Sequence, residues 1–116
     1  MTDLVSVETA ESGPCVVARV RGGMDYTVQR ELRERLTQAI DRAEQALILD
    51  MAGVTFCDSA GLNVLLGARR EAGRCEVALA LACAPGTVRR VLEMTGADQV
   101  LRVYATVADA EAALSR

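Results

Sequence analysis

Hydrophobic residues alternate with polar ones near the start of the chain and then change to helical spacing. Residues Leu4 to Thr9 and Cys15 to Arg21 are rich in β-branched side chains, and turn residues at 11–14 between them predict a hairpin. From Thr27 to Ala43 the apolar positions recur at helical spacing, which predicts an amphipathic helix packed on a sheet. The continuous apolar run Ala46 to Asp50 then predicts a central strand covered on both faces.

The middle of the chain repeats this change between helix and strand. A second helical pattern begins at Ser59 and stops near Gly73, a residue type that commonly follows a helix end. From Cys75 to Cys83, valine and leucine alternate with alanine, so one face of the predicted strand is bulky and the other is small. We therefore expect a helix to pack closely on the alanine side of this strand.

The last third of the chain contains signals for two more helices and one short strand. Pro85 suits the first turn of a third helix, and Gly96 closes it. The segment Val100 to Tyr104 is typical of a short strand. Thr106 to Asp109 resembles a capping box for a final helix that ends near Leu114.

The order of these elements predicts the fold class. Strands that alternate with helices indicate an α/β fold with a mixed, partly parallel sheet of four to five strands and about four helices packed against it. A chain of 116 residues is long enough for one core and too short for two. We therefore expect a single domain over residues 1–116.

The most informative stretch is the run from Val54 to Leu62, where an apolar segment ends at Asp58 and Ser59 and a helix begins. Asp and Ser both cap helices, so we expect Ser59 to cap this helix and also to be accessible, because Ala60 and Gly61 add little bulk. The helix dipole and the free N–H groups favour an anion there, so the helix could bear a phosphate on Ser59. The alternative interpretation is that Ser59 only caps the helix.

A second loop is predicted to lie close to Ser59. The segment Gly22 to Asp25 follows the second predicted strand, and if that strand is parallel to the third, both loops lie at the same sheet edge. Asp25 would then lie near Ser59, although it could equally cap the first helix together with Thr27. Val54, Phe56 and the leucines are expected in the core.

Composition excludes most catalytic classes. The chain has no histidine, and all 13 basic residues are arginine, so it cannot build a Ser-His-Asp triad, a Ser-Lys pair or a Walker-type phosphate loop. The four cysteines show no C-x-x-C pair, so we expect no structural metal and no cofactor. Cys57 lies beside Asp58, whose charge opposes a reactive thiolate, so burial as a small apolar residue is the better interpretation.

Charge and hydropathy bear on partners and location. A net charge of -3 and only three aromatic residues argue against a nucleic-acid surface. The start of the chain lacks the signals of a secretory leader, and no apolar run is long enough to span a bilayer, which favours a cytoplasmic protein without a membrane partner. Arg69, Arg70 and Arg74 fall in the last turns of the second helix, where we interpret them as solvated charges that complement the helix dipole.

Four motifs in order resemble the STAS domain family, in particular the bacterial anti-sigma factor antagonists. The run Gly53 to Leu62, GVTFCDSAGL, matches the family phrase G-V-T-F-x-D-S-x-G-L. Upstream, Gly22 to Asp25 matches G-E-L-D except that Gly23 replaces the glutamate. The segment Pro85 to Gly96 resembles the family's third helix, and Val103 to Leu114 resembles its C-terminal segment, so the likeness spans essentially the whole chain.

The resemblance implies a partner-switching protein. Its unmodified form would bind an anti-sigma factor that is also a serine kinase and so release a sigma factor, and phosphorylation would abolish that binding. Ser59 matches the phosphoacceptor. The residues expected to contact the kinase or partner lie around it: Asp25, Asp58, Ala60, Gly61 and Asn63.

Three further consequences follow from the resemblance. The kinase would supply ATP and magnesium, a phosphatase of the metal-dependent PP2C type would reset the switch, and this chain would be a substrate and not an enzyme. Two other roles stay open, a STAS adaptor that is never phosphorylated, in a signalling or lipid-transport complex, and a small-ligand sensor. The sigma factor, the stimulus and the oligomeric state are not predicted.

Overall fold

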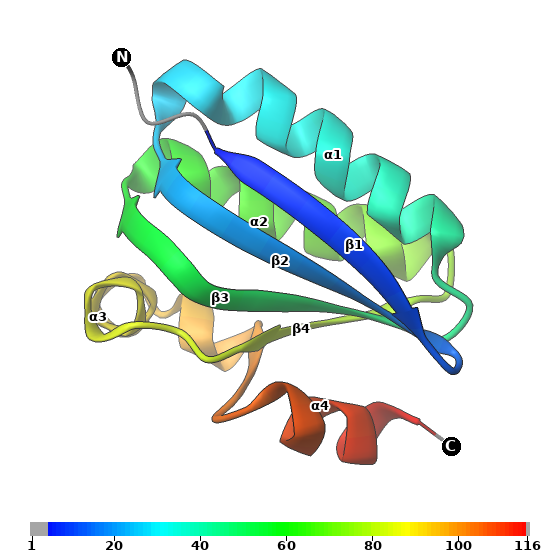
Figure 1. The fold of residues 1–116 in the computed structure, drawn as a ribbon. Coiled ribbons are helices and arrows are strands. Elements are labelled where there is room, and N and C mark those ends of the chain that lie inside the picture. The colour runs from blue at the N-terminus through cyan, green and yellow to red at the C-terminus, as the bar shows by residue number, and fades with distance from the viewer. Residues whose placement is uncertain (1–4, 116) are drawn as a thin grey trace.

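A five-stranded sheet lies at the centre of the computed structural model, which describes residues 5–115 (Figure 1). Its strands stand side by side in chain order: β1 (Ser6–Ser12), β2 (Cys15–Met24), β3 (Ala46–Cys57), β4 (Ala78–Ala82) and β5 (Arg102–Tyr104). β1 runs antiparallel to β2, and each later pair of neighbours is parallel. The mixed α/β sheet expected from the sequence is confirmed.

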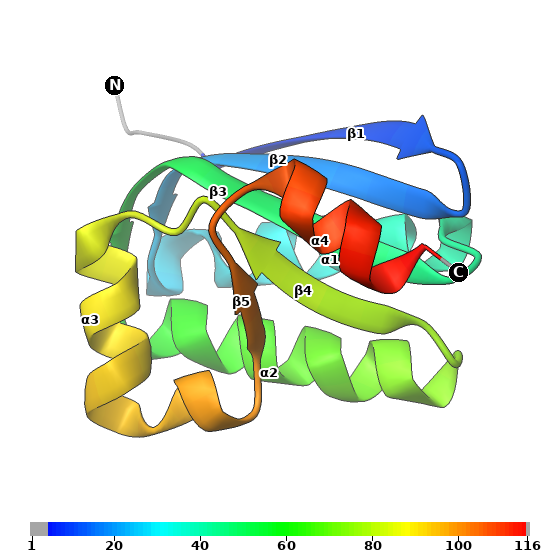
Figure 2. The same ribbon diagram turned by 90° about the horizontal axis from the view of Figure 1, so that it is seen from below.

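Four helices cover the two faces of this sheet. They are α1 (Gln29–Arg42), α2 (Ser59–Arg74), α3 (Gly86–Thr95) and α4 (Val107–Leu114). Side chains of α1, α2 and α3 share one large hydrophobic core with the sheet, whereas α4 packs on the opposite face (Figures 1 and 2). Because the strand order follows the chain, crossovers of one hand bring α1, α2 and α3 to the same face.

The alternating side chains of β4 explain why α4 approaches the sheet closely. Leu79 and Leu81 belong to the larger core, while Ala80 and Ala82 form a smaller cluster with Ala110 of α4. All five side chains are buried. Methyl groups on both surfaces let helix and sheet pack closely, so the expectation of a helix on the alanine side is confirmed.

β2 and β3 are both longer than the sequence pattern predicts. The pattern places their ends at Arg21 and Asp50, yet the two strands stay paired until Met24 and Cys57. Two register shifts interrupt this pairing, one between Arg19 and Arg21 and one between Gly22 and Gly23. Hydrogen bonding to the neighbouring strand holds these residues extended, and the pattern of side chains alone does not reveal it.

The remaining strand boundaries shift by fewer residues. Ser12 pairs with Cys15, so the hairpin turn contains only residues 13 and 14 and not all of 11–14. β4 begins at Ala78 and not at Cys75, because the chain turns between α2 and β4. β5 begins at 102 because a 3-10 turn, Ala97–Gln99, precedes it. Leu4, the first residue of the first predicted strand, lies outside the described residues.

The helix ends agree closely with the sequence signals. Residues 26–28 form a 3-10 turn before α1. Pro85 is the N-cap of α3, and Gly96 ends that helix with a left-handed φ of 77°. The backbone N–H of Asp109 donates to Thr106 Oγ1 over 3.0 Å, which confirms the predicted cap of α4.

Candidate functional site

The carboxyl ends of β2 and β3 meet at one edge of the sheet. Met24 is paired with Cys57 in the parallel register, and the N–H of Asp58 donates to the Met24 carbonyl oxygen over 3.2 Å. The loop that carries Asp25 and the start of α2 therefore lie side by side, as expected for parallel strands. We call this surface the Ser59 edge, made of residues 22–26 and 56–63.

Asp58, and not Ser59, is the N-cap of α2. Its Oδ1 accepts hydrogen bonds from the N–H groups of Ala60, over 2.9 Å, and Gly61, over 3.0 Å. This corrects the expectation that Ser59 caps the helix. Ser59 is instead the first helical residue, it is exposed, and its hydroxyl has no hydrogen-bond partner within residues 5–115. The carboxylate satisfies the capping requirement and leaves the hydroxyl free.

Gly61 allows the first turn of α2 to sit directly on the loop after β2. A Cβ atom at Gly61 would lie 2.3 Å from the carbonyl oxygen of Met24 and 2.9 Å from the Met24 Cβ. No real Cβ tolerates such contacts with backbone, so this position requires glycine. Ala60 is partly buried, and Asn63, one turn after Ser59, is exposed on the same side of the helix.

Asp25 caps the 3-10 turn that precedes α1. Its Oδ1 accepts from the N–H of Thr27 over 3.0 Å and also from the Thr27 hydroxyl. The hydroxyl hydrogen bond, joined by backbone N–H groups, lowers the pKa of the Asp25 carboxyl. The cap shared with Thr27 is confirmed, while no hydrogen bond joins Asp25 to Ser59 in the part of the chain that the structure describes. Asp25 thus contributes a fixed negative charge to the edge.

Two exposed aromatic side chains lie at the Ser59 edge. Phe56 is 51% exposed and Tyr26 is 73% exposed. The expectation that Phe56 lies in the core is therefore wrong, although Val54 is buried. Phe56 projects from the face of β3 opposite Cys57, and the residues of β3 that cluster with Ala110 of α4 on that face are Ala46 and Ile48, near the start of the strand. Simple alternation would place Phe56 on the same face as the buried Val54. The register shift between the pairs Gly22–Val54 and Gly23–Phe56 breaks that alternation, and the sequence gives no sign of it.

Cys57 is a buried thiol beside the cap. Its Sγ donates to the Asp58 carbonyl oxygen over 3.6 Å. Burial, with a smaller contribution from the Asp58 charge, raises the pKa of Cys57 to about 11. The thiol is therefore protonated at neutral pH, and the interpretation of Cys57 as a buried apolar residue is confirmed.

The Ser59 edge offers a hydroxyl that can accept a group but offers little that could activate it. The carboxylates on the same segments are those of Asp25 and Asp58, and both are engaged in capping. No cluster of three or more metal-ligating side chains occurs in residues 5–115. None of the helices within that range has the length and apolar character needed to cross a bilayer.

Comparison with known proteins gives a consistent picture. A sequence model of the STAS domain matches residues 6–110. The anti-sigma-F factor antagonist RsfB of Mycobacterium tuberculosis is 25% identical over 108 residues, which cover 93% of this chain and 88% of RsfB.

Solved structures share the fold. An anti-sigma factor antagonist from Mycobacterium paratuberculosis superposes with a TM-score of 0.89 over the whole of both chains, at 24% identity. SpoIIAA in its unphosphorylated form gives a TM-score of 0.73 at 24% identity, over 90% of this chain and 92% of that one. The phosphorylated form of the Bacillus SpoIIAA gives 0.67 at the same identity, over 90% and 96% of the two chains.

Proposed function

The chain belongs to the STAS domain family, and we propose that it is an anti-sigma factor antagonist that works by partner switching. Unphosphorylated, it binds an anti-sigma factor that is also a serine kinase, and this binding frees a sigma factor. Phosphorylation of Ser59 abolishes the binding, so the chain is a substrate of the kinase and not an enzyme. The observation that carries the proposal is the exposed, unpartnered Ser59 hydroxyl at the start of α2.

The comparisons support this assignment. RsfB carries the name of an anti-sigma-F factor antagonist, and its match extends over nearly all of this chain. SpoIIAA has been solved both with and without a phosphate, so the fold is compatible with a modified and an unmodified state. The position of Ser59 in the Asp-Ser pair, which opens α2, agrees with a residue that changes its charge at the surface.

The local electrostatics favour release on phosphorylation. A phosphoryl group adds about -1.5 to -2 charges at neutral pH. It would stand beside the carboxylate of Asp58, whose Oδ1 already holds the Ala60 and Gly61 N–H groups, so those two donors are not free to neutralise it. A partner complementary to the neutral hydroxyl then meets a dianion, and a penalty of about 3 kcal/mol weakens binding more than 100-fold.

The proposed partner-binding surface extends from Ser59 across the rest of the Ser59 edge. Asn63 lies one turn along α2 and is exposed, while Phe56 and Tyr26 offer apolar area on the adjoining strand and loop. Aromatic side chains are enriched among the residues that dominate binding energy at interfaces. We assign Asp25, Asp58, Ala60 and Asn63 to the rim of this surface, and Gly61 acts by holding α2 against Met24.

Two enzymes complete the cycle in this proposal. The anti-sigma factor transfers the phosphoryl group from ATP with magnesium, and a phosphatase of the PP2C type removes it. Both supply the chemistry that this chain lacks, since it contains neither histidine nor lysine.

A quantitative pull-down tests the function. The baits are the wild type, Ser59→Ala and Ser59→Asp, each incubated with a lysate of the source cells and read by mass spectrometry. We expect an anti-sigma factor kinase on the wild type and on Ser59→Ala, and its loss from Ser59→Asp.

Ser12→Asp is the matched control. It places the same charge on an exposed serine at the hairpin, beyond the amino-terminal end of β2 and away from the Ser59 edge. This bait should retain the kinase. If all four baits retain the same proteins, Ser59 is not a switch and the domain is a constitutive adaptor.

A further inference from the structure

A groove of about 120 Å³ lies between α1 and α2, where the two helices pack side by side (Figure 1). Its walls come from residues 33–37 of α1 and 64–71 of α2. Leu36 and Ala68 are buried at its floor, whereas Arg33 and Thr37 are exposed beside its opening. Gly67 forms part of the α2 wall. We call this cavity the Gly67 groove.

The groove continues the Ser59 edge along α2. Ser59, Asn63 and Gly67 follow one another at intervals of four residues, so they form one row on the surface of the helix. The row drifts slowly around the helix, because four residues are slightly more than a turn of about 3.6 residues. It begins at the exposed Ser59 and reaches the α1 side at Gly67, about 12 Å along the helix axis. A partner seated on the Ser59 edge that follows this row therefore meets the groove.

The fold itself does not require glycine at position 67. Gly67 lies inside α2, and its φ is not left-handed. Apart from the backbone of its own helix, a Cβ atom there would meet only Arg70 Nη2 among residues 5–115, at 3.7 Å. Glycine makes a helix less stable than alanine does, so the chain loses stability here without gaining a contact inside the molecule. A glycine of this kind suits a position that something from outside approaches closely.

Arg33 leaves a positive charge unpaired beside the groove. No acidic residue lies three or four positions from it along α1, where the residues are Gln29, Arg30, Leu36 and Thr37. Glu71, on the α2 wall, is already engaged, because its Oε1 lies 3.6 Å from Arg74 Nη1. The ion pairs within residues 5–115 do not include Arg33. The charge of Arg33 is therefore available to a carboxylate from another molecule.

The size of the groove fits a side chain of a protein better than a small molecule. Small-molecule sites begin at about 300 Å³, and this groove has less than half that volume. Leu36 and Ala68 give it an apolar floor, while the bare Gly67 lets a second backbone come close. Rows of residues four apart are also the surfaces along which helices pack on one another.

We propose that the anti-sigma factor kinase lays a helix along the row from Ser59 to Gly67 and inserts one of its apolar side chains into the Gly67 groove. A carboxylate on the same helix pairs with Arg33. This contact rests on the proposed function, because it extends the surface that the partner of the Ser59 edge occupies. An amphipathic helix in a groove is a common mode of recognition, and a charge pair at its border fixes the orientation of the partner.

Calorimetric titration with the pure kinase tests this contact. The probe is the anti-sigma factor kinase that the wild type retains in the pull-down, titrated into the full chain. Gly67→Leu fills the groove, so it should raise the Kd by about tenfold or more. Gly67→Ala should raise the Kd by a smaller factor. Both variants should keep at least the wild-type unfolding midpoint, because alanine and leucine favour the helix. A purely structural role for Gly67 would instead weaken binding only together with stability.

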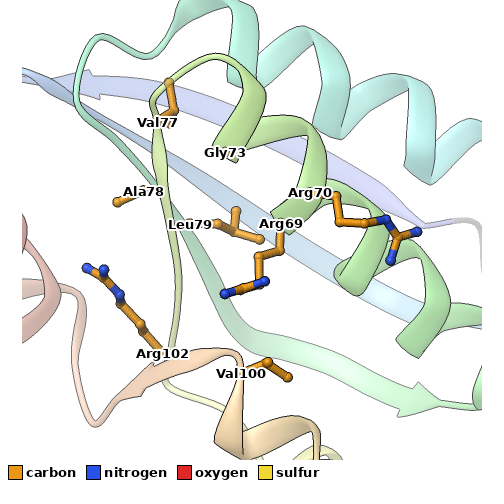
Figure 3. Close-up of a pocket in the computed structure, with 8 residues that line it drawn as sticks. All are labelled: Arg69, Arg70, Gly73, Val77, Ala78, Leu79, Val100 and Arg102. Carbon is orange, nitrogen blue, oxygen red and sulfur yellow. The ribbon is translucent and has the colours of Figure 1, made fainter.

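Gly73→Leu is the matched control for the groove. Gly73 is in the same helix, and a Cβ atom there would have no neighbour within 4 Å. It lines a separate cavity of about 280 Å³ between α2, β4 and β5, whose lining also includes Arg69 and Arg102 (Figure 3). Gly73→Leu should bind the kinase as tightly as the wild type does.

A charge reversal tests the pairing of Arg33. Arg33→Glu should raise the Kd for the kinase by about tenfold or more. Arg102→Glu is its control, because Arg102 is exposed on β5 and belongs to none of the ion pairs within residues 5–115. This variant should leave the Kd unchanged.

Ser59→Asp, titrated in the same way, separates this contact from the partner switch. Suppose that the kinase binds the wild type and is lost from Ser59→Asp, yet binds Gly67→Leu and Arg33→Glu as tightly as the wild type. The groove then has no part in the contact, and the partner switch stands. Equal weakening by Gly67→Leu and Gly73→Leu would also overturn the proposed contact. If no kinase binds the wild type, the partner switch fails and the contact fails with it.

Discussion

At the scale of single residues, Gly61 lets α2 pack against the loop after β2 because glycine has no Cβ atom. Replacing it with alanine places a Cβ atom 2.3 Å from the Met24 carbonyl oxygen, so the first turn of α2 must move away from β2. We expect Gly61→Ala to lower the free energy of unfolding by about 3 kcal/mol, the upper end for overpacking, because the obstacle is backbone. Urea denaturation measures this change.

Gly67→Ala is the matched control in the same helix. An added Cβ there meets only the mobile end of Arg70, at 3.7 Å. Alanine is the better helix former, so this variant should be more stable than the wild type by about 0.5–1 kcal/mol. Equal effects of the two substitutions would show that helix propensity, and not the contact with Met24, governs Gly61.

Cys57 gives the molecule a pH dependence in the alkaline range. Its pKa is about 11 in the folded protein against an ordinary value of 9.0, because the thiol is buried and lies beside Asp58. Between these values the unfolded chain has lost the thiol proton and the folded chain has kept it, so stability falls as the pH rises from 9 to 11. Below pH 9 this contribution is constant.

Unfolding free energies of the wild type and Cys57→Ala across this range isolate the effect. The wild type should lose stability more steeply than Cys57→Ala, while Cys75→Ala, which removes an exposed thiol, serves as the control. Parallel curves for all three proteins would mean that Cys57 ionises as readily in the folded state as in the unfolded one.

The identity of the helix cap shows where sequence patterns stop being informative for the site. Asp58 and Ser59 are adjacent and both residue types favour the cap, so the sequence located the helix start and could not choose between them. The choice is made by the backbone, since Asp58 is still extended and its N–H is held by Met24. Ser59 is displaced into the first turn as a result.

At the scale of elements, the small side chains of β4 decide how closely α4 can pack. Ala80 is 1% exposed and faces Ala110 of α4. Ala80→Leu inserts a larger side chain between the helix and the sheet, so the unfolding free energy should fall by about 1–3 kcal/mol. Thermal and urea denaturation together measure this loss.

Ala112→Leu is the control for that variant, because Ala112 is on the exposed side of the same helix. It should change stability by less than about 0.5 kcal/mol. If Ala80→Leu proves equally neutral, α4 is loosely attached and the alanine face has no packing role.

The same helix explains why Phe56 was wrongly expected in the core. α4 has eight residues and is about 12 Å long, whereas β3 has twelve residues. The helix therefore covers only the first half of one face of β3, and Phe56 projects from the uncovered half. Hydrophobicity predicts which side chains favour burial. Whether a side chain is buried also depends on whether the element that packs on its strand is long enough to cover it.

At the scale of the whole molecule, the alternation of strands and helices was enough to predict the fold. It did not predict which charged side chains line the same cavity. Once strands and helices are recognised in order, few sheet topologies remain, so the Ser59 edge could be anticipated from parallel strands. Arg69 and Arg102 belong to segments far apart in the chain, and only the position of β5 beside β4 brings them to one cavity.

The architecture also implies that the switch at Ser59 operates without refolding. Ser59 is exposed at the end of the sheet, and the buried core of residues 5–115 holds no polar or charged side chain that a new charge could disturb. We therefore expect Ser59→Asp to shift amide NMR signals at residues 24–26 and 56–63 only. Ser12→Asp should instead shift signals of the hairpin. Changes that spread into β4 and β5 would show that the two states differ in backbone. β4 ends level with Asp50, while β3 continues to Cys57 before Ser59 is reached, so β4 and β5 can sense the new charge only through a rearrangement of the sheet.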